Sequence, residues 1–268
     1  MTSPIWIERE DYRLASYVSG QYSDAPTIVL SNSLGADHTM WKEQLALLEP
    51  QYRVIRYDTR GHGRSDPTAG PYSFDGLVAD VVAVMDTHGV DKADFMGLSL
   101  GCMTGLGLAL AHPERLGRMI CAAGRADAPE AFVQNWDNRL RILAEDGFEG
   151  LWAMTQGMWF TEGFRKAEPD RVEAFRAAFF ATSTNGYAGC CEALKTLDYL
   201  RHLGGVTTPT LFVAGEKDMG APPDVMRAMA EATPGARLVE IADAGHIVNA
   251  GQPAPYNAAL AEFLEITQ

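Results

Sequence analysis

The chain has 268 residues, of which 47% are apolar, and a formal net charge of −13 at pH 7. This length allows one large domain or a domain with an insertion, and the negative charge argues against nucleic acid or an anionic membrane as a partner, because either would be repelled. The four cysteines (Cys102, Cys121, Cys190 and Cys191) have neither metal-ligand nor disulfide-framework spacing, so no metal site is expected.

The first half of the chain alternates predicted strands and helices. Residues 1–9 lack the basic start and apolar core of a signal peptide, and no apolar run reaches membrane-spanning length, so we expect a cytoplasmic protein. Alternating polarity over residues 6–19 predicts two short antiparallel strands at a sheet edge, and residues 21–26 form a polar turn. Compact apolar runs predict buried strands at 27–30, 53–57 and 93–96. Longer periodic stretches predict helices at 40–48, 75–88 and 102–111. This order favours a mostly parallel α/β sheet with helices on both faces.

The alternation stops after a further strand at 118–123. Residues 125–200 are almost continuously helical in character and rich in Trp and Phe, which is too long and too apolar for a linker. The alternation then resumes, with strands predicted at 210–214 and 237–241 and helices at 223–232 and 254–266. The pattern predicts a core of residues 1–124 and 201–268 with a helical cap, residues 125–200, inserted over the strand ends.

A serine flanked by glycines marks the end of the strand at 93–96. The segment Gly97-Leu98-Ser99-Leu100-Gly101 has the G-x-S-x-G spacing of a nucleophile elbow, in which a sharp strand-to-helix turn exposes the serine hydroxyl. The flanking positions must be small because strand and helix pass closely there. We therefore expect Ser99 to be the nucleophile and the Leu100 amide to face the oxyanion.

A serine hydroxyl needs a base, and the base needs an orienting acid. After a nucleophile elbow, the acid and then the base follow later strands, which selects Asp218 after strand 210–214 and His246 after strand 237–241. Glu216 and Asp243 are the rival acids. The other five histidines are at helix ends, between glycines or at expected surface positions. The second oxyanion donor is expected in the loop after strand 27–30, where the amide of Ser33 is best placed.

The chain resembles the α/β-hydrolase superfamily over nearly its whole length, and within it the 3-oxoadipate enol-lactonases of the β-ketoadipate pathway. The resemblance rests on Ser31-Asn32-Ser33-Leu34-Gly35, on residues 56–65 (RYDTRGHGRS), on the elbow, and on Trp159-Phe160-Thr161 and residues 186–193 (GYAGCCEA) in the cap. Cys102 departs from the second glycine usual after the elbow. The resemblance implies a serine hydrolase of a small lactone or ester that needs no cofactor.

The sequence leaves several readings open. The same three residues would serve a C–C bond hydrolase or a cofactor-free perhydrolase, and a non-catalytic receptor of the same fold is the alternative from another class. If the substrate carries a carboxylate, a cap cation must bind it at short range, and Arg125 or Arg139 is our hypothesis. Trp136 and Trp159 are the candidate substrate contacts among aromatics that form either a pocket or the cap's own core. The acyl chain, the ring size and the oligomeric state stay open.

Overall fold

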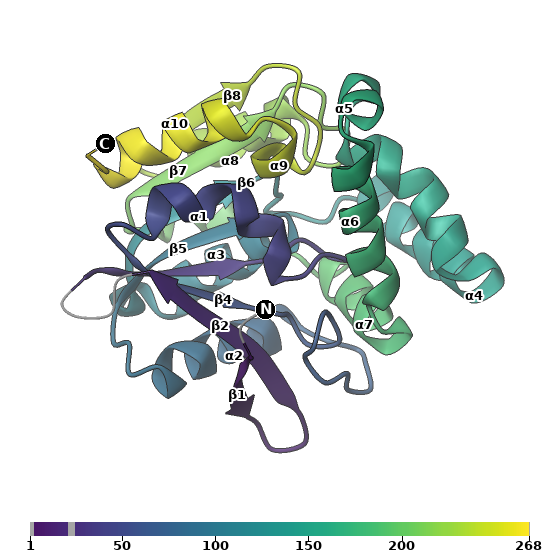
Figure 1. Ribbon diagram of the computed structural model, residues 1–268, viewed down its shortest axis with the longest axis horizontal. Coiled ribbons are helices and arrows are strands. Elements are labelled where there is room, and N and C mark those ends of the chain that lie inside the picture. Colours follow the sequence, from purple (N-terminus) through teal and green to yellow (C-terminus); the bar gives the residue numbers. More distant parts are fainter. Residues whose placement is uncertain (1–2, 21–24, 268) are drawn as a thin grey trace.

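The computed structural model describes residues 3–20 and 25–267, so most of the predicted turn at 21–26 lies outside the described residues. Its strands are β1 (Ile5–Glu8), β2 (Arg13–Gly20), β3 (Thr27–Ser31), β4 (Arg53–Tyr57), β5 (Ala93–Leu98), β6 (Leu116–Ala122), β7 (Thr210–Gly215) and β8 (Arg237–Ile241). They form one sheet in the order β1-β2-β4-β3-β5-β6-β7-β8 (Figure 1). Only β1 and β2 run antiparallel to their neighbours. The expected α/β sheet with an antiparallel edge is confirmed.

The helices predicted outside residues 125–200 agree with the structure to within a few residues, and the structure adds short helices at 113–115, 200–205 and 248–251. The helices are η1 (His38–Trp41), α1 (Lys42–Leu48), α2 (Phe74–Thr87), α3 (Leu100–Ala111), η2 (Pro113–Arg115), α4 (Glu130–Trp159), α5 (Glu162–Ala167), α6 (Pro169–Ala181), α7 (Thr184–Leu194), η3 (Leu200–Gly205), α8 (Pro223–Ala232), α9 (Val248–Gly251) and α10 (Pro253–Leu264). The Ser73 hydroxyl caps α2 by accepting from the Gly76 amide at 3.1 Å.

The sheet is buried on both faces because successive side chains of a strand point to opposite sides. In β3, Ile28 belongs to a core cluster with Leu48 of α1 and Leu260 of α10, whereas its neighbour Val29 belongs to a second cluster with Leu106 of α3. α1 and α10 therefore cover one face and α2, α3 and α8 the other, which explains why the central strands read as unbroken apolar runs.

Helices α4–α7 stand together at one end of the sheet (Figure 1). Their interior is aromatic: the Trp159 and Phe179 rings meet edge to face with centroids 5.5 Å apart. Backbone hydrogen bonds join this group to the sheet loops, from the Ser183 amide to the Gly61 carbonyl (2.8 Å) and from the Ile247 amide to the Trp159 carbonyl (3.2 Å). The helical content of this stretch agrees with the expected cap, while the division of the chain into core and cap stays a prediction.

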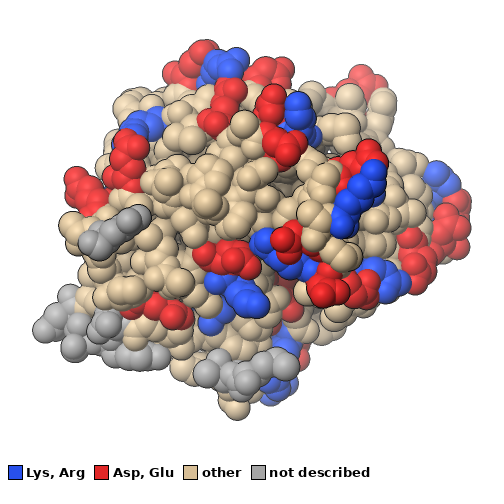
Figure 2. Space-filling model, turned by 45° about the horizontal axis from the view of Figure 1, so that its top comes forward, with Lys and Arg blue, Asp and Glu red and all other residues tan. Residues whose placement is uncertain are grey.

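Acidic and basic side chains are interspersed in small groups over the face shown in Figure 2. Some pairs join helices, as where Arg176 of α6 lies 3.0 Å from Glu149 of α4. Exposed pairs contribute roughly 0–1 kcal/mol, so the aromatic contacts are the main contribution to packing among α4–α7. Of the helices described, none combines the length and apolar character needed to cross a bilayer.

Candidate active site

Ser99 lies between the last residue of β5 and the first residue of α3, in a strained backbone conformation. Its φ of 56° and ψ of −113° are rare for a residue with a side chain. A Cβ on Gly97 would lie 2.2 Å from the Gly101 carbonyl oxygen, and one on Gly101 would lie 2.1 Å from the Ser31 carbonyl oxygen. Both glycines are therefore required by close backbone approach, which is the physical reason for the G-x-S-x-G spacing.

His246 and Asp218 form a buried pair. The imidazole Nδ1 lies 2.8 Å and 3.0 Å from the two Asp218 carboxylate oxygens, and Asp218 also accepts bonds from the amides of Gly220 (2.7 Å) and Ala221 (3.1 Å). The His246 amide donates to the Met158 carbonyl of α4 at 3.2 Å. With Nδ1 occupied by the carboxylate, Nε2 is left for a proton transfer.

The rival acids lie elsewhere. Glu216 is exposed and accepts a bond from the Asp243 amide at 2.8 Å, which lowers the pKa of the Glu216 carboxyl together with the neighbouring Lys217. Asp243 is exposed as well. Of the three carboxylates, the structure brings only Asp218 to His246.

One histidine departs from the expectation of a surface position. His38 Nδ1 lies 2.9 Å from Asp58, and its ring stacks on Tyr17 with centroids 3.5 Å apart. Its side chain is only 19% exposed, because the loop after β3 turns it back against β2. The expectation of a surface position was wrong because the Tyr17 ring of β2 covers the imidazole.

The loop after β3 borders the same site. The Ser33 amide faces the Met40 sulfur at 3.4 Å, a weak acceptor. Leu100 begins α3, and a first-turn amide has no intrahelical acceptor. Both predicted oxyanion donors thus lie beside the elbow and carry no strong competing acceptor.

A cavity borders Ser99 in two parts that share five lining residues. The outer part, of about 420 Å³, has an exposed Met219 at its rim, and the inner part is only about 20 Å³. Residues common to both are Ser99, Trp136, Arg139, Met158 and His246. Ser33 and Trp159 border the inner part, and Arg125 the outer part.

Arg139 is buried beside Ser99 and His246, and no acidic side chain in the described part of the chain pairs with it. Its Nη1 donates to the Thr155 hydroxyl (3.0 Å) and to the Tyr187 hydroxyl (3.1 Å), and the guanidinium lies over the Trp136 ring. It forms no ion pair with any carboxylate in the described part of the chain, and its Nε has no acceptor there. The indole Nε1 of Trp136 is equally without an acceptor.

Three other basic residues of the stretch 125–200 are already paired. Arg125 lies 3.1 Å from Asp127 and stacks on Phe132. Arg141 pairs with Glu145, and Lys195 lies 2.7 Å from Asp137. Trp159, the remaining predicted contact, borders the inner part of the cavity and also packs on Trp152, so it serves both the pocket and the aromatic interior.

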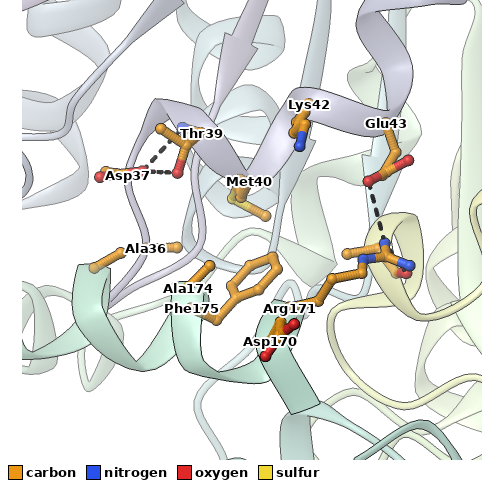
Figure 3. Close-up of a pocket in the computed structure, with 12 residues that line it drawn as sticks. Ala36, Asp37, Thr39, Met40, Lys42, Glu43, Asp170, Arg171, Ala174 and Phe175 are labelled. Carbon is orange, nitrogen blue, oxygen red and sulfur yellow. Dashed lines mark hydrogen bonds and ion pairs between the residues drawn. The ribbon is translucent and has the colours of Figure 1, made fainter. Parts of the chain in front are cut away.

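A second cavity, of about 300 Å³, lies between α6 and the η1–α1 segment and holds none of the predicted site residues (Figure 3). Met40 and Phe175 face each other across it, and Glu43 pairs with Arg171 at its edge (3.5 Å). Over the described ranges, no group of three or more His, Cys, Asp or Glu side chains is arranged to hold a metal ion.

Comparison with known proteins shows the family of the chain. Residues 26–252 match the family model described as "alpha/beta hydrolase fold". The chain is 36% identical to 3-oxoadipate enol-lactonase 2 of Acinetobacter baylyi over 91% of each chain, and 32% identical to enol-lactonase 1 of that organism over 97% of this chain and 96% of the relative. The crystal structure of an enol-lactonase from Burkholderia xenovorans, 36% identical, superposes with a TM-score of 0.93 over 97% of this chain and all of that one. The protein belongs to the alpha/beta hydrolase family.

Proposed function

We propose that the protein hydrolyses a small carboxylate-bearing lactone of the 3-oxoadipate enol-lactone type, by acyl-enzyme chemistry on Ser99 and without a cofactor. The reaction type is supported by the His246–Asp218 pair, whose His246 lines a cavity together with Ser99, and by relatives named as enol-lactonases. The observation that carries the substrate class is the unpaired, buried guanidinium of Arg139 in that cavity. The proposal treats residues 125–200 as a cap over a core of residues 1–124 and 201–268.

In the first half of the proposed reaction, Ser99 Oγ attacks the lactone carbonyl carbon while His246 Nε2 takes the hydroxyl proton. Asp218 holds the imidazole by its Nδ1–H and stabilises the imidazolium. The tetrahedral oxyanion accepts bonds from the Leu100 and Ser33 amides, and one such donor contributes about 3–4 kcal/mol. The ring C–O bond then breaks, and His246 gives its proton to the leaving oxygen.

In the second half, a water molecule attacks the acyl-enzyme carbonyl while His246 again acts as the base. The bond between Ser99 Oγ and the acyl carbon breaks, and the proton passes from His246 to Ser99. One water is consumed and one open-chain acid is released. The Ser33 amide is available for both oxyanions, because a carbonyl-derived anion is a far stronger acceptor than the Met40 sulfur.

The substrate's carboxylate is assigned to Arg139 rather than Arg125. A buried ion without a counter-ion costs several kcal/mol, and a carboxylate at Arg139 would offset that cost by accepting from the free Nε. Trp136 Nε1 would supply a second, neutral donor. Arg125 already has the Asp127 carboxylate, so a ligand there would have to displace it.

The test is kcat/KM for a carboxylated lactone and for its methyl ester, in the wild type and in Arg139→Met and Arg125→Met. Loss of a charge-assisted hydrogen bond, about 1.5–3 kcal/mol, corresponds to roughly 10- to 100-fold for the carboxylated substrate in Arg139→Met. The methyl ester should change little, and Arg125→Met is the matched control. A wild type that prefers the ester, with a ratio that neither variant changes, would mean that the substrate is neutral.

Three further assays separate the alternatives. Turnover of a p-nitrophenyl ester is expected here, and its absence would favour a non-catalytic receptor. Comparing lactones with vinylogous diketones distinguishes the proposed lactonase from a C–C bond hydrolase on the same three residues, and peracid formation would identify a perhydrolase.

A further inference from the structure

The short helix α9 begins two residues after His246, and one buried side chain anchors it. Asn249 is 0% exposed, and its Nδ2 donates to the Met40 carbonyl at 2.8 Å and to Gln44 Oε1 at 3.0 Å. Gln44 Nε2 returns a bond to the Asn249 carbonyl at 3.1 Å. The segment that carries His246 is thus bonded to η1 and α1, which lie about two hundred positions earlier in the chain.

The same contact reaches the loop that carries Ser33. Met40 receives the Asn249 bond at its backbone, and its sulfur faces the Ser33 amide at 3.4 Å. Met40 is 3% exposed, and its side chain borders the cavity of about 300 Å³ opposite Phe175 of α6 (Figure 3). Asn249 therefore connects the His246 segment to the Ser33 loop through one residue.

A side chain of α6 also bonds to α9. Arg171 Nη2 donates to the Ala250 carbonyl at 2.8 Å, next to Asn249, and pairs with Glu43 of α1 at 3.5 Å. α9 is consequently fixed against both α1 and α6 by polar contacts that are directional, unlike apolar packing.

Filling space is a poor explanation for an asparagine at this position. Asn249 Oδ1 is buried and finds no hydrogen-bond partner among the residues described. An unsatisfied buried acceptor is costly, and a leucine of similar size would fill the space without that cost. What the asparagine adds is the directed Nδ2 contact to Met40.

We propose that Asn249 is a positioning residue for the hydrolysis: it holds the His246 segment and the Ser33 loop at the separation that the oxyanion and the proton transfer both require. This inference rests on the proposed function, in which His246 is the base and the Ser33 amide an oxyanion donor. Misplacing reacting groups by about 1 Å is enough to lower a rate by about 100-fold.

The experiment compares the wild type with Asn249→Leu, Asn249→Ala and the control Asn257→Ala on one p-nitrophenyl ester, with kcat expressed per fluorophosphonate-titrated site. Asn257 bonds Gln44 (3.0 Å) and the Glu43 carbonyl (2.8 Å), and neither of these hydrogen bonds involves Met40. We expect both Asn249 variants to lose roughly 10- to 100-fold in kcat with KM within about twofold, and Asn257→Ala to keep its kcat.

The leucine variant fills the same space as the asparagine, so a loss in that variant is not explained by a cavity in the fold. Expressing kcat per titrated site removes the effect of unfolded protein. A kcat per site within about twofold of the wild type in the Asn249 variants, or an equal loss in Asn257→Ala, would overturn the proposal. Failure of the proposed function itself is distinguishable, because the wild type would then fail to turn over ester or to be labelled at Ser99.

Discussion

The backbone of Gly35 lies directly against the Phe179 ring. A Cβ added to Gly35 would come within 2.5 Å of the ring carbon Cδ2, and Gly35 has a φ of 78°. Gly35 belongs to the loop after β3, and Phe179 lies on α6 and borders the inner part of the cavity with Ser33. The aromatic interior of α4–α7 therefore packs against the loop after β3, which borders the same cavity as Ser99.

Gly35→Ala should destabilise the protein more than an alanine substitution at another positive-φ glycine where the added Cβ meets no neighbouring atom. The left-handed conformation costs about 1–2 kcal/mol with a Cβ, and overpacking against Phe179 adds about 1–3 kcal/mol. Gly89→Ala is the matched control, since Gly89 has a φ of 65° and nothing within 4 Å of the added Cβ. Urea unfolding of both variants measures the difference, and equal losses would contradict the steric contribution of Phe179.

Ser99→Ala should leave the fold intact and lower kcat by about 10⁴-fold or more, because the proposed covalent step depends on that hydroxyl alone. Mass spectrometry after treatment with a fluorophosphonate should show one adduct, on Ser99. Labelling of any other serine would mean that the nucleophile has been assigned to the wrong residue.

Asp218→Asn should reduce kcat far more than Glu216→Gln or Asp243→Asn. Of the three carboxylates, only Asp218 contacts the His246 ring, and an amide in its place no longer fixes the Nδ1–H tautomer. Steady-state kinetics of the three variants on one ester decide the point. A comparable loss in Asp243→Asn would move the acid role to that residue.

Two histidines should make the protein less stable at mildly acidic pH. Burial lowers the pKa of His62 and of His88 below 6.5, with Arg53 adding to the effect at His88. The unfolded chain therefore binds protons at a higher pH than the folded one, so stability is full above about pH 6.5 and falls below it, by at most about 1.4 kcal/mol per pH unit for each histidine.

The measurement is the free energy of unfolding in urea from about pH 8 to about pH 5.5, for the wild type and His88→Asn. The variant should show a shallower decline below about pH 6.5, while above it the difference between the two proteins should not vary with pH. Parallel curves over the whole range would exclude His88 as a contributor.

Much of this architecture is readable from local pattern. The strands and helices follow from apolar runs and periodicity, which depend on neighbouring residues only, and the elbow is visible because Gly97 and Gly101 are required by close backbone approach. The late positions of Asp218 and His246 follow from chain order in such a sheet. None of these inferences requires knowing a distance between distant segments.

The pairing of side chains across the chain was decided only by the tertiary structure. From the sequence, Arg125 and Arg139 are equal candidates for binding a carboxylate. In the structure, Arg125 pairs with Asp127, two residues away. Arg139 is buried against Tyr187, 48 positions later, and has no counter-ion in the described chain. Likewise His38 is drawn inward by Asp58, and Asn249 meets Met40 across 209 positions. Burial and partner choice depend on how separate elements pack, and hydrophobic periodicity carries no information about which polar group a distant loop will present.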